Sequence, residues 1–150
     1  MVEFHRPTAA GRGITLQVDI SGSHHVVDAD PGDIERMIGN LLSNAIKYNL
    51  EAGKVFVSLV SDSGMIRLKV RDTGIGMTPE ETKRLGEEFY RVKNSKTRSI
   101  TGTGLGLSLV KKIVASYNGA MEIDSTPGEG STFQVVIPAC PEISAAENWK

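Results

Sequence analysis

The sequence has little cysteine, few aromatic residues and no long apolar run, and each shortage excludes a class of protein. Cys140 is the only cysteine, so an internal disulfide is excluded, and no histidine–cysteine cluster has metal-ligand spacing. Aromatic residues make up 5% of the chain, which disfavours a base-stacking surface for nucleic acid. No apolar stretch approaches the length of a membrane span, and the first residues do not resemble a signal peptide. We therefore expect no direct membrane contact.

Neither sign of charge dominates. Lys and Arg number 17 and Asp and Glu 18, which gives a net charge of −1 and no basic surface for nucleic acid. The hydrophobic content of 39% is typical of globular proteins, and 150 residues suffice for one domain. We expect residues 1–140 to form that domain and residues 141–150 to be a polar tail.

Periodicity predicts alternating strands and helices along the chain. Apolar–polar alternation indicates strands and a spacing of three to four residues indicates helices. The predicted helices cover residues 3–10, a segment opened by Asp30, a segment that begins at Thr78 and ends around 86–90, and a segment from about 105 to 118. The predicted strands cover residues 14–20, 24–29, 55–61, 65–70, 121–125 and 131–137.

The strand over 65–70 runs into the turn Asp72-Thr73-Gly74-Ile75-Gly76. Glycine at such a turn allows the backbone to bend and a flat ligand to lie close to it. A carboxylate fixed there is a good acceptor for an exocyclic amino group. Taken alone, however, the motif is also typical of an ordinary tight turn between a strand and a helix.

The helix that Asp30 opens has two stripes. Its apolar residues recur at helical spacing and predict a core face. Asn40, Asn44 and Lys47 follow one another at steps of four and three, so they share a second stripe. Two amides and an ammonium in one row can hold a hydrated Mg²⁺ ion and the phosphates it bridges. The alternative is an ordinary solvated helix face.

A cationic segment precedes a glycine-rich turn in the second half of the chain. Residues 91–103 carry several cations and few apolar anchors, which is typical of a lid or of a flexible surface loop. The motif Gly102-Thr103-Gly104-Leu105-Gly106-Leu107 then leads into a helix. Such a turn presents backbone N–H groups to phosphate oxygens, although no Gly-Lys-Ser/Thr follows as in a P-loop.

Two further motifs are Phe89-Tyr90-Arg91 and Gly128-Glu129-Gly130-Ser131-Thr132-Phe133. In chain order the motifs resemble the N, G1, F, G2 and G3 boxes of the catalytic ATP-binding domain of sensor histidine kinases, a group shared with gyrase, ninety-kilodalton heat-shock chaperones and mismatch-repair ATPases. The resemblance covers about residues 4–138. It implies an α/β (α+β) two-layer sandwich of the Bergerat type, in which three helices cover one face of a mixed, mostly antiparallel sheet. It also implies ATP and Mg²⁺ as cofactors.

The resemblance assigns roles residue by residue. Asp72 would accept the adenine amino group, Asn44 would ligate Mg²⁺, and Arg91 would approach the γ-phosphate. The implied catalytic residues are Asn40, Lys47 and Arg91. The implied nucleotide-binding residues are Asn44, Tyr48, Asp72, Gly74, Gly76, Gly102, Thr103, Gly104, Leu105, Gly106, Leu107 and Thr132.

Two departures from the family pattern refine this expectation. Asn40 stands where the ATPase branches carry a glutamate that activates water, and an amide is a poor general base. We therefore expect the domain to hold ATP without splitting it efficiently. Gly86 stands near a position where relatives usually carry a phenylalanine. The absence of that large apolar side chain would weaken an anchor for the lid and for docking against the dimerisation helices.

No histidine of the chain fits the phospho-acceptor pattern. His5 lacks the acidic residue expected after it, and His24 and His25 lie in a predicted strand. The resemblance thus implies a module cut from a longer cytoplasmic or membrane-anchored kinase, monomeric by itself. Its direct partner would be a histidine-bearing dimerisation domain, and a response regulator would be charged indirectly. Two alternatives stay open: a nucleotide-sensing interaction module without efficient transfer, and a serine kinase of the anti-sigma type.

Overall fold

The computed structural model describes residues 1–141, which form nine helices and strands. In chain order they are α1 (Val2–Gly11), β1 (Thr15–Ser21), α2 (Pro31–Lys47), β2 (Lys54–Asp62), β3 (Met65–Asp72), α3 (Pro79–Arg84), α4 (Gly106–Ser116), β4 (Ala120–Thr126) and β5 (Gly130–Pro138).

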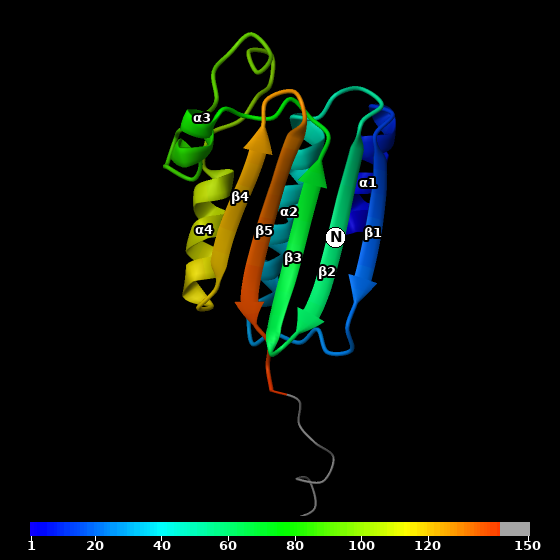
Figure 1. Cartoon of the computed structure of the whole chain (residues 1–150), viewed down its shortest axis with the longest axis vertical. Helices are drawn as coiled ribbons and strands as arrows, with labels where there is room; N and C mark the ends of the chain where they lie inside the picture. Colours follow the sequence, from blue (N-terminus) through cyan, green and yellow to red (C-terminus); the bar gives the residue numbers. More distant parts are fainter. Residues whose placement is uncertain (142–150) are drawn as a thin grey trace, which may run out of the picture.

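The strands form one sheet in the order β1-β2-β3-β5-β4. β1 and β2 are parallel because α2 provides the crossover between them, and the other neighbours are antiparallel. Figure 1 shows α1, α2 and α4 behind the sheet, while its other face is open. The predicted mixed sheet with three helices on one face is confirmed.

The core lies between the sheet and these helices. Along β3 the burial alternates, so that Leu68 and Val70 face the helices and Lys69 faces solvent. The apolar stripe of α2 packs on this face, with Leu41 and Leu42 fully buried. The core therefore arises from a strand pattern of period two meeting helix stripes of period 3.6.

Capping residues fix where two helices begin. The Asp30 carboxylate accepts hydrogen bonds from the N–H groups of Gly32 (2.7 Å) and Asp33 (3.3 Å) at the start of α2. Thr78 and Glu81 form a reciprocal capping box at α3. The predicted starts of both helices, at Asp30 and Thr78, are confirmed.

The ends of several helices and strands meet at one end of the sandwich. In Figure 1, the carboxyl ends of α2 and β3, the amino end of α4 and the β4–β5 turn all lie at the top, beside the segment that joins α3 to α4. The fold thereby gathers the predicted motifs, which are far apart in sequence.

Two element predictions were wrong. Residues 24–29 form no strand: the His24 ring nitrogen Nε2 donates to the Cys140 carbonyl (2.8 Å), and the Cys140 N–H donates to the Val26 carbonyl, so the segment is tied to the chain after β5. α3 ends at Arg84 rather than around 86–90, because Leu85 is extended and Gly86 has a φ of +85°. A left-handed residue of this kind ends a helix.

The predicted tail falls almost wholly on residues 142–150, which lie outside the described part. Across residues 1–141, no helix combines the length and the apolar character that a membrane crossing requires.

Leu41→Ala should test the core assignment. Leu41 is fully buried, so truncation removes apolar contacts and leaves a cavity, which costs about 2–5 kcal/mol of unfolding free energy. Urea denaturation measures this loss. Leu50→Ala is the matched control, because Leu50 is 49% exposed and its truncation should cost less than about 0.5 kcal/mol. Equal effects of the two substitutions would contradict the core described here.

Candidate functional site

A pocket of about 360 Å³ opens at the end of the sandwich where the motifs meet. Its walls come from α2, the end of β3, β5 and the segment between α3 and α4. Of the predicted site residues, those that line it are Asn40, Asn44, Lys47, Tyr48, Asp72, Gly76, Arg91, Gly102, Thr103, Gly104, Gly106 and Leu107.

Asp72 is the polar end of a buried row. In the alternation of β3, Asp72 points to the same side as Leu68 and Val70. Its carboxylate therefore lies on the core face, and the residue is only 4% exposed. Oδ1 accepts hydrogen bonds from the backbone N–H groups of Gly74 (2.8 Å) and Ser131 (3.3 Å). Within residues 1–141 both bonds use Oδ1, so Oδ2 is the oxygen that a ligand's amino group can reach.

Burial controls the charge of this carboxyl. Loss of hydration raises the pKa of Asp72 from 3.8 to about 6, and the hydrogen bonds from Gly74 and Ser131 oppose part of that rise. The group is therefore ionised at neutral pH, but at a cost. A carboxylate short of hydration is a strong acceptor for an amino group.

The two glycines of the turn have different roles. Gly76 lines the pocket, its φ is +65°, and a Cβ there would run into the backbone of Thr126. Glycine is therefore required at this position. Gly74 does not line the pocket, contrary to the expectation that it would line the base site; its N–H instead holds Asp72 in place.

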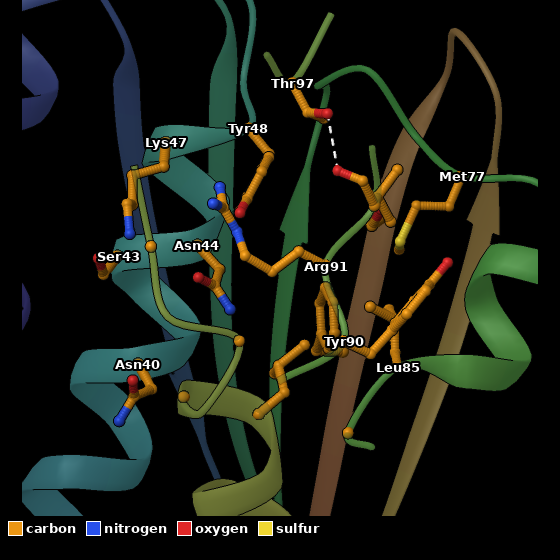
Figure 2. A pocket seen from close by; sticks show the side chains of 18 of the residues that line it. Asn40, Ser43, Asn44, Lys47, Tyr48, Met77, Leu85, Tyr90, Arg91 and Thr97 are labelled. Carbon is orange, nitrogen blue, oxygen red and sulfur yellow. Dashed lines mark hydrogen bonds between the residues drawn. The ribbon is translucent and has the colours of Figure 1, made fainter. Parts of the chain in front are cut away.

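The polar stripe of α2 forms the opposite wall. Figure 2 shows Asn40, Ser43, Asn44 and Lys47 along one side of this helix, with Tyr48 at its end. Asn40 Nδ2 donates to the Arg36 carbonyl (2.8 Å), which fixes the orientation of that amide. Ser43 was missed by the sequence prediction, although its place three residues after Asn40 puts it in the same stripe.

An apolar wall faces this stripe. It is formed by residues that the sequence analysis did not single out, namely Ile75, Met77, Leu85, Tyr90, Val92 and Phe133. A flat apolar base fits between such side chains and Asp72. Thr132 was predicted here, but Ser131 and Phe133 line the pocket instead. The pleat explains this correction, because Thr132 pairs with Arg71 on the open face of the sheet.

Internal contacts order the segment between α3 and α4. The buried Thr97 hydroxyl donates to the Val92 carbonyl (2.7 Å), and Asn94 caps the same turn. The Arg91 guanidinium points into the pocket toward Tyr48 and Asn44 in Figure 2, and it donates to the Ile100 carbonyl. Thr97 was another residue missed from sequence, because a threonine in a polar run gives no sign of burial.

The amino end of α4 borders the same space. No side chain caps this helix, and Gly102, Thr103, Gly104, Gly106 and Leu107 line the pocket around its first turn. Uncapped N–H groups at a helix start suit an anionic ligand. Leu105 was predicted to bind nucleotide, but it is 38% exposed and does not line the pocket. The turn of the helix directs it outward.

Gly86 lies at the pocket rim beside a lysine of α4. Lys111 Nζ donates to the Leu85 carbonyl (2.8 Å), and a Cβ at Gly86 would meet the Lys111 side chain. Lys111 thus fills space next to the position where relatives were expected to carry phenylalanine.

The donor set of the pocket fits a hydrated magnesium ion bound through an amide. Residues 1–141 contain no group of three or more His, Cys, Asp or Glu side chains arranged to hold a metal. The Asn44 side chain lines the pocket, and Mg²⁺ accepts one amide oxygen while keeping waters and phosphate oxygens.

Comparison with known proteins identifies the family. A family described as "Histidine kinase-, DNA gyrase B-, and HSP90-like ATPase" matches residues 29–141. The chain belongs to this ATPase family. Membership of this family implies that the chain binds ATP.

Similar proteins point to the kinase branch of this ATPase family. The sensor-like histidine kinase SenX3 of Mycolicibacterium smegmatis is 37% identical over 141 residues, which cover 94% of this chain and 36% of the relative. The sensor histidine kinase RppB of Synechocystis is 34% identical over 83% of this chain and 28% of the relative. The chain therefore spans about a third of these relatives.

A solved structure shares the architecture of this ATPase-family domain. The mycobacterial sensor histidine kinase MprB superposes with a TM-score of 0.80 and 29% sequence identity. The match covers 93% of this chain and 91% of that one.

Asp72→Asn should stabilise the ligand-free protein at high pH. The folded-state pKa is raised, so ionising Asp72 destabilises the fold; the penalty is absent below pH 3.8 and complete above about pH 6. A pKa raised from 3.8 to about 6 corresponds to at most about 3 kcal/mol. The variant should therefore gain about 1–3 kcal/mol of unfolding free energy at pH 8 and little at pH 4, as measured by urea denaturation.

The control for this substitution is Asp19→Asn, on the exposed part of β1, which should change stability little at either pH. A gain for Asp72→Asn that is the same at pH 4 and pH 8 would contradict the burial cost assigned to this carboxylate.

Proposed function

We propose that this chain is the catalytic domain of a two-component sensor histidine kinase. It binds Mg-ATP and donates the γ-phosphoryl group to a histidine on a dimerisation domain outside this chain. ADP is released, and a response regulator later receives the phosphoryl group from that histidine. Because ATP is the donor, we place the domain on the cytoplasmic side of the cell.

The observation that carries this proposal is the pairing of two different walls in one pocket. Asp72 sits among apolar residues at one end, where an adenine amino group can bind. Asn44, Lys47 and Arg91 line the part of the pocket that suits phosphates. A ligand with an adenine and a charged tail matches both ends.

Asn40 favours transfer over hydrolysis. Its amide donates to the Arg36 carbonyl and has no basic atom that could take a proton from water. Transfer to an acceptor histidine instead requires positioning and charge neutralisation by Lys47 and Arg91. Asn44 would hold Mg²⁺, whose charge neutralises the phosphate oxygens when it is bound.

An exposed apolar cluster beside the pocket suits the partner domain. Phe89 is 70% exposed, and Leu105 and Leu109 are each 38% exposed. Phe89 N–H donates to the Gly104 carbonyl, which places Phe89 next to Leu105, and Leu109 follows one turn later on α4. An aromatic and aliphatic cluster of this kind is a natural anchor for an amphipathic helix.

Gly86 supports a second candidate, a nucleotide-sensing module without efficient transfer. Lys111 rather than a large apolar side chain fills the space beside Gly86. A lid without that apolar anchor could respond to the nucleotide but hold a partner weakly. Phosphoryl transfer to an added dimerisation domain separates the two candidates.

Calorimetric titration tests the site directly. The domain should bind a non-hydrolysable ATP analogue more tightly with Mg²⁺ than with a chelator. Asp72→Ala should lose about tenfold or more in affinity for both the analogue and adenosine. Asn44→Ala should bind adenosine like the wild type but lose the Mg²⁺ enhancement. Failure of the folded wild type to bind any nucleotide would refute the proposed function.

Phe89→Ala should separate transfer from binding. Because the ring does not line the nucleotide pocket, affinity for the ATP analogue should stay unchanged. Transfer to a supplied dimerisation domain should fall about tenfold, as for an interface anchor. Phosphate incorporation from labelled ATP measures it, and Leu50→Ala, also exposed, is the control. Full transfer by the Phe89 variant would place the docking surface elsewhere.

A further inference from the structure

Arg12, which follows α1, binds the carboxyl end of α2 from outside the pocket. Its Nη1 donates to the carbonyls of Ile46 and Lys47 (3.1 Å for Lys47), and its Nη2 donates to the Asn49 carbonyl (2.9 Å). Nε donates to Glu51 (3.0 Å), whose side chain is 74% exposed. One guanidinium thus contacts three carbonyls at and just after the end of α2, where the last helix carbonyls have no N–H partner in a following turn; that of Ile46 also accepts from the Asn49 N–H (3.3 Å).

These carbonyls belong to the turn that carries the phosphate-side residues. Lys47 is the last residue of α2 and Tyr48 is its C-cap, and both line the pocket. Arg12 does not contact the Tyr48 carbonyl, which lies between those of Lys47 and Asn49 in the sequence. That carbonyl instead accepts a hydrogen bond from the Ile75 N–H (3.1 Å), in the turn after Asp72. The end of α2 is therefore fixed on one side by Arg12 and on the other by the base-binding turn.

Charge adds a second effect. The carboxyl end of a helix carries the negative end of its dipole, which disfavours an anion nearby. The phosphates of a bound nucleotide would lie beside this end, because Asn44 and Lys47 occupy the last turn of α2. Arg12 places a positive charge on the carbonyls that generate this field, and its side chain is only 32% exposed, so solvent screens it incompletely.

We propose that Arg12 is a positioning residue for the triphosphate: it holds the last turn of α2 in place and offsets the negative potential there. It acts through Lys47 and Tyr48 and does not touch the ligand. The assignment rests on the proposed function, since it requires a nucleotide with an anionic tail. The assignment also predicts that loss of Arg12 weakens ATP binding more than adenosine binding, because adenosine uses the Asp72 end of the pocket and carries no phosphate.

The test compares two ligands on each variant. Titration with adenosine and with a non-hydrolysable ATP analogue plus Mg²⁺ gives the ratio of their affinities. Arg12→Ala should lose about tenfold for the analogue and less than about twofold for adenosine. Arg12→Lys, which keeps the charge but lacks the planar fork, should show a smaller loss of the same kind.

Two substitutions serve as controls. Arg6→Ala removes another arginine that donates to a backbone carbonyl, that of Leu16, but on β1 and away from α2. Glu51→Gln removes the exposed partner of Arg12 and leaves the three carbonyl contacts in place. Arg6→Ala should keep the wild-type ratio of affinities, and Glu51→Gln, which removes a negative charge beside Arg12, should not lower the relative affinity for the analogue.

Each outcome decides the proposal. A selective loss for the analogue supports it, whereas an equal loss for both ligands, or no loss, overturns it and leaves Arg12 a merely structural residue. If Arg12→Ala does not fold, the ratio for Arg12→Lys decides in the same way. If the folded wild type binds neither ligand, the proposed function itself fails, which is distinguishable from a failure of the Arg12 assignment.

Discussion

The buried carboxylate of Asp72 is the interaction on which the site depends. It lies on the core face of β3, where every preceding inward residue is apolar, and two backbone N–H groups hold Oδ1. The fold tolerates this poorly hydrated charge because Gly74 and Ser131 supply those donors. The remaining oxygen then offers a ligand a strong acceptor, so the cost of burial and the capacity to select an amino group have the same origin.

The rest of the pocket depends on two helix ends and one connecting segment, which meet beside that carboxylate. The carboxyl end of α2 brings amides and an ammonium, the amino end of α4 brings uncapped N–H groups, and the intervening segment brings Arg91. A helix end with a negative potential stands close to where phosphates would bind. Lys47 inside the pocket and Arg12 outside it both lie where they can offset that potential.

Sequence reasoning succeeded where a local pattern carried the information. The helix starts at Asp30 and Thr78 follow from residue type, and the alternation of β3 and the stripe through Asn40 and Lys47 follow from periods of two and 3.6 residues; the structure confirms them. It failed where distant segments decide. Residues 24–29 were predicted as a strand but pair with no strand of the sheet, and Thr132 lies one residue out of phase with the pocket.

The sequence by itself determined the fold class, the family and most of the polar residues that line the pocket, because these depend on composition, periodicity and motif order. Only the tertiary structure decided which side chains face the pocket. Phe133, Leu85 and Thr97 sit in ordinary contexts in the sequence, and their roles come from the pleat of β5 and the packing of the segment before α4. Arg12 is the clearest case, because its carbonyl partners lie more than thirty residues away along the chain.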